Sequence, residues 1–157
     1  MSQTVTALSP VTDHATPLDD DDDPRAPARQ RFVNQHLPAH AVIEALPADA
    51  SFRRYFRVQG ADRPYLVMDA PPEHENLPAY LEVAHYLRGQ GFAAPEIVAE
   101  DIEDGFGLIE DFGDQTYTRL LASGADEFAL YGLAIDVLAQ LHQKPTPSAD
   151  SNIPAYD

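Results

Sequence analysis

The stretch of this sequence best suited to binding chemistry is residues 49–58, which read Asp-Ala-Ser-Phe-Arg-Arg-Tyr-Phe-Arg-Val. It holds three of the ten basic residues in a 157-residue chain whose formal net charge is −16. A short turn ending at Ser51 leads into a predicted strand, so backbone N–H groups, a hydroxyl and the guanidinium groups of Arg53 and Arg54 come together. Donors of this kind suit a phosphate group.

The same stretch also fits an ordinary amphipathic strand, because its residues alternate between two faces. One predicted face carries Phe52, Arg54, Phe56 and Val58, and the other carries Ser51, Arg53, Tyr55 and Arg57. Alternation is a packing signal, so from the strand alone both interpretations stay open.

The elements that must position these residues follow from periodicity, capping and turn residues. We expect a helix at 27–37, strands at 41–46, 51–58 and 65–69, a helix at 77–89, strands at 94–100 and 107–112, and helices at 116–123 and 126–142. This order predicts an α+β fold, with one helix interposed in a five-stranded antiparallel sheet. The last helix carries an apolar stripe that predicts burial.

Composition narrows the class of protein. Hydrophobic residues make up 44% of the chain, and 157 residues suffice for one domain with a real core. Residues 1–24 contain no Lys or Arg and end in a run of aspartates and a proline, which predicts a disordered acidic tail. The acidity argues against a nucleic-acid partner.

The chain has no cysteine, so neither disulfides nor thiolate metal sites are expected. No apolar run approaches the roughly 18 to 20 residues that span a membrane. The first twelve residues lack the basic start and apolar core of a signal peptide. We therefore expect a cytoplasmic protein without a membrane partner.

Several segments, taken in order, resemble the aminoglycoside-phosphotransferase/choline-kinase superfamily, and most closely its bacterial N-acetylmuramate/N-acetylglucosamine anomeric kinases. The segments that carry the resemblance are 49–58, 67–72, 91–98, 108–114 with Thr116-Tyr117, 138–142 and 153–157. The resemblance implies a protein-kinase-like smaller lobe at 25–112. It also implies that 113–157 form the hinge and the first helices of an incomplete larger lobe.

The resemblance further implies a nucleotide site. The loop around Ser51, Phe52, Arg53 and Arg54 would fold over the phosphates of ATP, although it has no glycine. Met68 stands where the family presents a lysine to the phosphates, and no lysine precedes Lys144. A thioether cannot neutralise phosphate charge, so arginines and Mg²⁺ would have to do so.

Two further roles are implied by the resemblance. Glu110, Asp111 and Phe112 would form the hinge that contacts adenine, although a strand ending in a turn explains them equally well. Glu82 on the helix at 77–89 is the nearest candidate for the family's acidic partner of the lysine, with a solvated helix residue as the alternative.

No catalytic residue is expected in this chain, because neither a His-Gly-Asp-type loop nor a later metal-binding aspartate motif is present. The Mg²⁺ ligands are expected outside it. We expect the chain to be the N-terminal piece of a longer ATP-dependent kinase and to be inactive alone. The larger lobe would be its packing partner, so in the absence of that lobe we expect apolar surface on 129–141 to be exposed. The expected acceptor is N-acetylmuramate or N-acetylglucosamine in cell-wall recycling. An aminoglycoside or choline acceptor and a non-catalytic protein-binding module remain alternatives.

Overall fold

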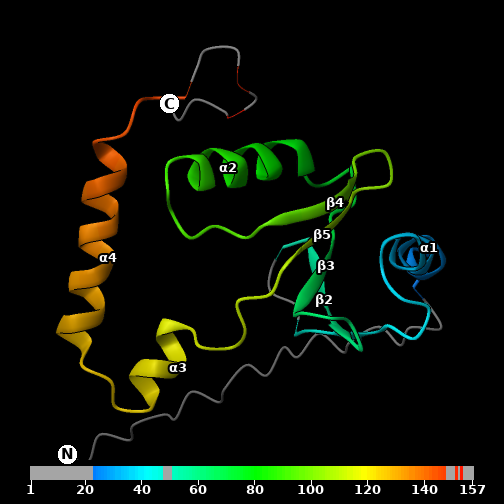
Figure 1. Ribbon diagram of the computed structural model, residues 1–157, viewed down its shortest axis with the longest axis horizontal. Coiled ribbons are helices and arrows are strands. Elements are labelled where there is room, and N and C mark those ends of the chain that lie inside the picture. The colour runs from blue at the N-terminus through cyan, green and yellow to red at the C-terminus, as the bar shows by residue number, and fades with distance from the viewer. Residues whose placement is uncertain (1–22, 48–50, 148–150, 152, 154–157) are drawn as a thin grey trace, which may run out of the picture.

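A five-stranded antiparallel sheet forms the centre of the computed structural model, which describes residues 23–47, 51–147, 151 and 153 (Figure 1). The strand order is β1-β2-β3-β5-β4. The strands are β1 Val42–Ala45, β2 Arg54–Gln59, β3 Tyr65–Asp69, β4 Ile97–Asp101 and β5 Phe106–Glu110. The helices are α1 Ala26–His36, α2 Leu77–Gly89, α3 Tyr117–Ala122 and α4 Glu127–His142. The predicted α+β class and the interposed helix, α2, are confirmed.

Helix α1 covers one face of the sheet, called here the α1 face. Alternation along the strands turns their apolar side chains toward this helix. The buried cluster joins the helix residues Phe32 and Val33 to Phe56, Val58, Tyr65, Val67, Phe106 and Leu108 of the sheet. Each such side chain contributes about 1.5–3 kcal/mol when fully buried, so α1 is an integral layer of the fold.

Helix α2 covers part of the opposite face, the α2 face (Figure 1). Leu77 and Leu81 of the helix pack on Met68 of β3 and on Ala70, which directly follows that strand. The helix begins where the sequence predicts it, because the Asn76 side chain accepts a hydrogen bond from the Ala79 N–H at 3.0 Å.

Three predicted boundaries need correction. Strand β2 begins at Arg54 rather than Ser51, and Phe52 lies outside it with 60% of its surface exposed. Strand β4 begins at Ile97 rather than residue 94, since Pro95 lacks the N–H that a strand ladder requires. The tail was predicted to extend to residue 24, but Asp23 is buried, 7% exposed, and belongs to the folded body. Residues 1–22 lie outside the described part of the chain.

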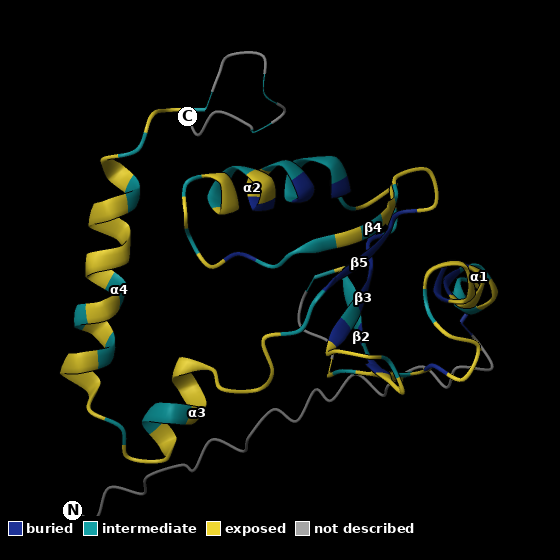
Figure 2. Cartoon of the chain, viewed as in Figure 1, coloured by how far each residue is buried: buried dark blue, intermediate teal, exposed yellow. Residues whose placement is uncertain are grey.

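Helices α3 and α4 stand apart from the sheet (Figure 1), and neither contains a buried residue. The apolar stripe predicted for the last helix is present but open to solvent, as Figure 2 shows. Leu133 is 55% exposed, Leu138 54% and Phe128 90%. The apolar surface expected on this helix is therefore found, and the burial expected for its stripe is not.

Candidate functional site

A strip of partly exposed side chains runs along β2 on the α2 face. Tyr55 pairs with Met68 across the β2–β3 ladder and packs beside it in the α2-face cluster. Arg53 and Arg57 lie two residues before and after Tyr55, so strand alternation places them on the same face. They are about 13 Å apart along the strand direction, which makes the strip an elongated site with a basic residue at each end.

Two of the predicted phosphate-loop residues share one carboxylate at the first end of the strip. The Ser51 hydroxyl donates to Glu75 Oε1 at 2.9 Å and accepts from the Arg53 N–H at 3.0 Å. Arg53 Nε lies 3.1 Å from Glu75 Oε2. The Phe52 ring stacks on His74 with 4.3 Å between ring centroids. The short segment that enters β2 is thus docked on the turn that precedes α2.

The neighbouring arginine, Arg54, lies on the opposite face of the sheet. Its Nη1 contacts Asp23 Oδ2 at 2.6 Å, and its guanidinium lies over the Phe56 ring at 5.1 Å on the α1 face. The structure therefore does not place Arg54 with Ser51 and Arg53, although the sequence prediction grouped all three around a phosphate. Adjacent residues in a strand point to opposite faces, which is the physical reason.

A buried charge network explains what holds Arg54. Arg29 Nη1 bridges Asp23 Oδ2 at 2.8 Å and Asp69 Oδ2 at 3.0 Å, and Arg25 Nε donates to Asp69 Oδ1 at 2.7 Å. Burial alone would raise the pKa of Asp23, but hydrogen bonds from Arg29 and the Arg25 N–H, with the charges of Arg29 and Arg54, bring it below its usual value. The network fixes α1 to the sheet.

Met68 is fully buried on the α2 face. It packs with Ala70, Leu77 and Leu81, and a side chain added at Gly107 would come within 3.2 Å of its methyl group. The thioether therefore supports the floor of the strip and presents no surface to a ligand. The sequence prediction counted Met68 among the nucleotide-contacting residues, and the structure gives it a packing role.

The second end of the strip is where the chain leaves β5. The Asp111 N–H donates to the Pro64 carbonyl at 3.3 Å, but proline has no N–H to return a bond to the Asp111 carbonyl. Among the described residues, neither that carbonyl nor the Phe112 N–H has a hydrogen-bond partner. The two groups belong to one trans peptide unit and point in opposite directions, so the edge of a nucleobase can pair with only one of them.

Side chains hold this exposed backbone in place. Arg57 Nε donates to Asp111 Oδ2 at 2.7 Å and Arg57 Nη2 to Asp114 Oδ1 at 2.9 Å, while the Gly113 N–H donates to Asp111 Oδ1 at 2.7 Å. The bonds to Asp114 and Asp111 raise the pKa of Arg57. The bond from Arg57 lowers the pKa of Asp114. Glu110, also predicted here, accepts from the Glu96 N–H at 3.1 Å through its carboxylate.

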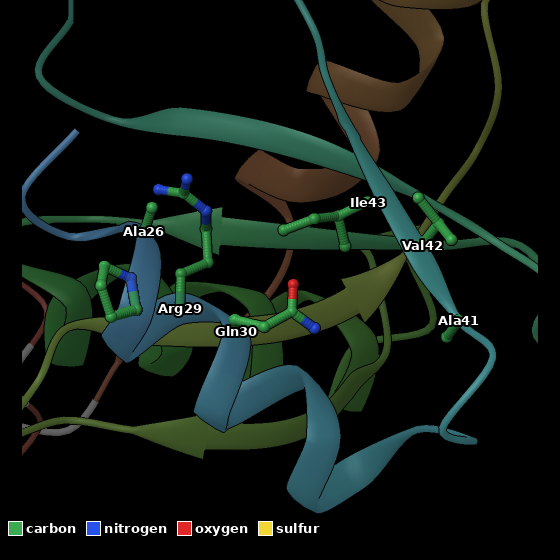
Figure 3. A pocket seen from close by; sticks show the side chains of 7 residues that line it. Ala26, Arg29, Gln30, Ala41, Val42 and Ile43 are labelled. Atoms are coloured by element: carbon green, nitrogen blue, oxygen red, sulfur yellow. The ribbon is translucent and has the colours of Figure 1, made fainter. Parts of the chain in front are cut away.

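Two hollows in the surface lie beside the strip rather than on it. One, of about 420 Å³, opens between α1 and β1 and is lined by Ala26, Arg29, Gln30, Ala41, Val42 and Ile43 (Figure 3). The other, of about 480 Å³, lies at the turn before α2 and includes His74 and Glu75. The first is on the α1 face, where the guanidinium of Arg29 is already ion-paired, so we place the candidate site on the strip.

The family model of phosphotransferase enzymes matches residues 42–154. The chain belongs to the phosphotransferase enzyme family. Both ends of the strip lie inside the matched range, whereas α1 precedes it. The predicted resemblance to this superfamily is therefore confirmed.

Three curated relatives, each named N-acetylmuramate/N-acetylglucosamine kinase, match most of this phosphotransferase-family chain. The Pseudomonas aeruginosa protein is 46% identical over 129 residues, which are 80% of this chain and 37% of the relative. The Pseudomonas putida protein is 41% identical over 122 residues, which cover 77% of this chain and 34% of the relative. The Caulobacter vibrioides protein is 34% identical over an alignment of 150 residues, which covers 78% of this chain and 41% of the relative. The chain thus spans well under half the length of these relatives.

Sequence reasoning missed one member of the site in this phosphotransferase-family chain, Glu75. Glu75 lies in a turn without periodicity, 24 residues from Ser51, and nothing in the sequence links the two. Strand alternation had predicted opposed directions for Arg53 and Arg54, but the resemblance grouped them in one phosphate loop. No group of three or more metal-binding side chains comes together among the described residues, and none of their helices is long and apolar enough to cross a membrane.

Proposed function

We propose that this chain is the nucleotide-binding lobe of an ATP-dependent phosphotransferase, with ATP lying along the strip on the α2 face. The observation that carries the proposal is the pairing of two kinds of open group at opposite ends of one strip. These are the terminal guanidinium nitrogens of Arg53 and the free backbone N–H of Phe112. A nucleoside triphosphate carries anionic oxygens at one end and a base edge at the other.

The phosphate end uses Arg53 in this proposal, with Ser51 held beside it by Glu75. Of the three arginines in or beside β2, Arg54 and Arg57 have terminal nitrogens bound to carboxylates. The Arg53 terminal nitrogens make no hydrogen bond to any described residue. A guanidinium edge that is open and partly exposed, with 34% of the side chain accessible, can take two phosphate oxygens at once.

The base end uses the backbone of residues 110–112. The Phe112 N–H would donate to a ring nitrogen of adenine, and the Glu110 carbonyl, two residues earlier, would accept from its amino group. The Phe112 side chain, 58% exposed, can cover the face of the base. Arg57 holds this segment through Asp111, so it acts on the base indirectly.

Magnesium would accompany the nucleotide and neutralise charge on its phosphates. The described residues offer no cluster that could hold the ion. We therefore assign it no ligand in this chain, and we expect the Mg²⁺ ligands and the catalytic residues in the remainder of the complete enzyme. The apolar surface of α4 would be covered by that remainder.

The acceptor proposed for the complete enzyme is the anomeric hydroxyl of N-acetylmuramate or N-acetylglucosamine, as a step in cell-wall recycling. The names of the relatives, N-acetylmuramate/N-acetylglucosamine kinases, support the choice of amino sugar. The chain's own described residues bind and orient the nucleotide, and no described residue is assigned to the sugar.

The test is ADP release from Mg·ATP by the protein expressed from its uninterrupted reading frame. N-acetylmuramate, N-acetylglucosamine, an aminoglycoside and choline are compared as acceptors. We expect turnover with the two amino sugars alone. Turnover only with another acceptor would overturn the sugar assignment. Absence of Mg·ATP binding would overturn the enzyme assignment and favour a protein-binding module.

A further inference from the structure

We infer that Glu75 is a positioning residue of the nucleotide site: it holds Arg53, and Ser51 beside it, so that the terminal guanidinium nitrogens of Arg53 face the phosphates. The inference rests on the proposed function and extends it to a residue outside the β2 segment. Glu75 lies in the turn between β3 and α2, and its side chain is only 16% exposed. None of its neighbours in sequence suggests this role.

The contacts of Glu75 divide the Arg53 guanidinium into a bound part and an open part. The carboxylate contacts the inner nitrogen, Nε, at 3.1 Å. The terminal nitrogens are left without a hydrogen bond to any described residue. A long side chain anchored near its end loses little further rotamer freedom when a phosphate binds, whereas an unanchored arginine loses much more.

The second oxygen of the same carboxylate fixes the hydroxyl. Ser51 donates its proton to Glu75 Oε1 at 2.9 Å and accepts from the Arg53 N–H at 3.0 Å. One carboxylate therefore sets the relative position of the two phosphate-loop side chains. Phe52 adds a second attachment through its stacking on His74, so the whole segment is aligned to the turn before α2.

Helix α2 completes the support. The Arg53 guanidinium lies 5.8 Å from the centroid of the Tyr80 ring, which extends from this helix. Burial, with a smaller effect from Tyr55, raises the pKa of Tyr80, and Arg53 works against that rise. The ring is therefore neutral and offers its face to the cation. Glu75 and Tyr80 together restrict Arg53 to one region of the α2 face.

The experiment is a double-mutant cycle with Arg53→Gln and Glu75→Ala, read as the dissociation constants of Mg·ATP and of adenosine. Arg53→Gln should weaken Mg·ATP binding about tenfold or more and leave adenosine within about twofold. Glu75→Ala should weaken Mg·ATP about threefold to tenfold, again without an effect on adenosine. In the Arg53→Gln background, Glu75→Ala should have little further effect, because the two act as a unit.

Matched controls separate positioning from charge and from folding. Arg31→Gln removes one positive charge from the exposed side of α1 and should leave both constants unchanged. Glu75→Gln keeps the shape and one acceptor oxygen, so it should recover part of the loss. Thermal melting of each variant shows whether it is folded.

Four results would overturn the inference. Tighter Mg·ATP binding in Glu75→Ala would mean that the carboxylate competes with phosphate for Arg53. Equal losses for Mg·ATP and adenosine would mean a general structural effect. If the wild-type protein binds and uses Mg·ATP while both variants behave like it, the inference fails and the proposed function stands. If the wild-type protein binds no nucleotide, both fail.

Discussion

Removing the buried carboxylate of Asp69 is the sharpest test of what holds α1 to the sheet. Asp69 is 1% exposed and binds Arg25 at 2.7 Å and Arg29 at 3.0 Å. Asp69→Ala leaves two cations facing each other across a buried gap. Removing one partner of a buried ion pair typically costs about 3–5 kcal/mol.

The structure favours the lower end of that range. Arg29 keeps its contact with Asp23 at 2.8 Å, and Arg25 keeps the Asp104 carbonyl at 2.6 Å. We therefore expect a loss of about 3 kcal/mol in the free energy of unfolding. With a urea slope of about 2 kcal/mol/M, the unfolding midpoint falls by roughly 1.5 M.

The assay is urea unfolding followed by circular dichroism, with Asp114→Ala as the matched control. Asp114 also pairs with an arginine, Arg57, but its side chain is 52% exposed, so its loss should be a small fraction of the loss at Asp69. Equal midpoints for the two variants would refute the reasoning, because the network would then contribute no more than a surface pair.

Three further predictions concern other parts of the fold. In urea unfolding, Gly105→Ala should lower the free energy of unfolding by at least twice the roughly 1 kcal/mol expected for Gly113→Ala. Both glycines have positive φ, but only at Gly105 would the added carbon overlap the Ala70 carbonyl oxygen. Equal losses for the two variants would contradict this. Because the pKa of Asp23 is lowered in the folded protein, its carboxylate stabilises the fold fully above about pH 4, and this stabilisation is lost as the pH falls through the folded pKa. Asp23→Asn should therefore lower the free energy of unfolding at pH 7 and flatten the acid side of its pH dependence. An unchanged acid slope would count against this. Phe128→Ser should change the free energy of unfolding by less than about 0.5 kcal/mol while reducing self-association in light scattering, because the ring is 90% exposed; a large loss of stability would place the ring in a core.

The regular parts of the fold could be predicted because their periodicity is local. The alternation at 51–58 predicted which side chains share a face, and the structure confirms it for Tyr55 and Arg57 against Phe56 and Val58. The bounds of α2 followed from its apolar spacing and its Asn76 cap. These signals lie within one element and need no knowledge of its neighbours.

The contacts that decide the candidate site could not be predicted, since they join residues far apart in the sequence. Asp23 lies 31 residues from Arg54, and Glu75 lies 24 residues from Ser51. A run of aspartates is usually a solvated tail, so nothing marked its last member as a buried partner of arginines. The role of Met68 was misjudged because its full burial depends on the packing of α2.

The measurement that tests the central claim most directly is photoaffinity labelling with 8-azido-ATP, followed by peptide mapping. The account predicts Mg²⁺-dependent labelling on the segment around residues 110–114, where the free Phe112 N–H and Asp111 carbonyl lie. Unlabelled ATP should compete with it, and Arg53→Gln should weaken it. Labelling confined to the hollow between α1 and β1, or labelling that ATP does not displace, would contradict a nucleotide site on the α2 face.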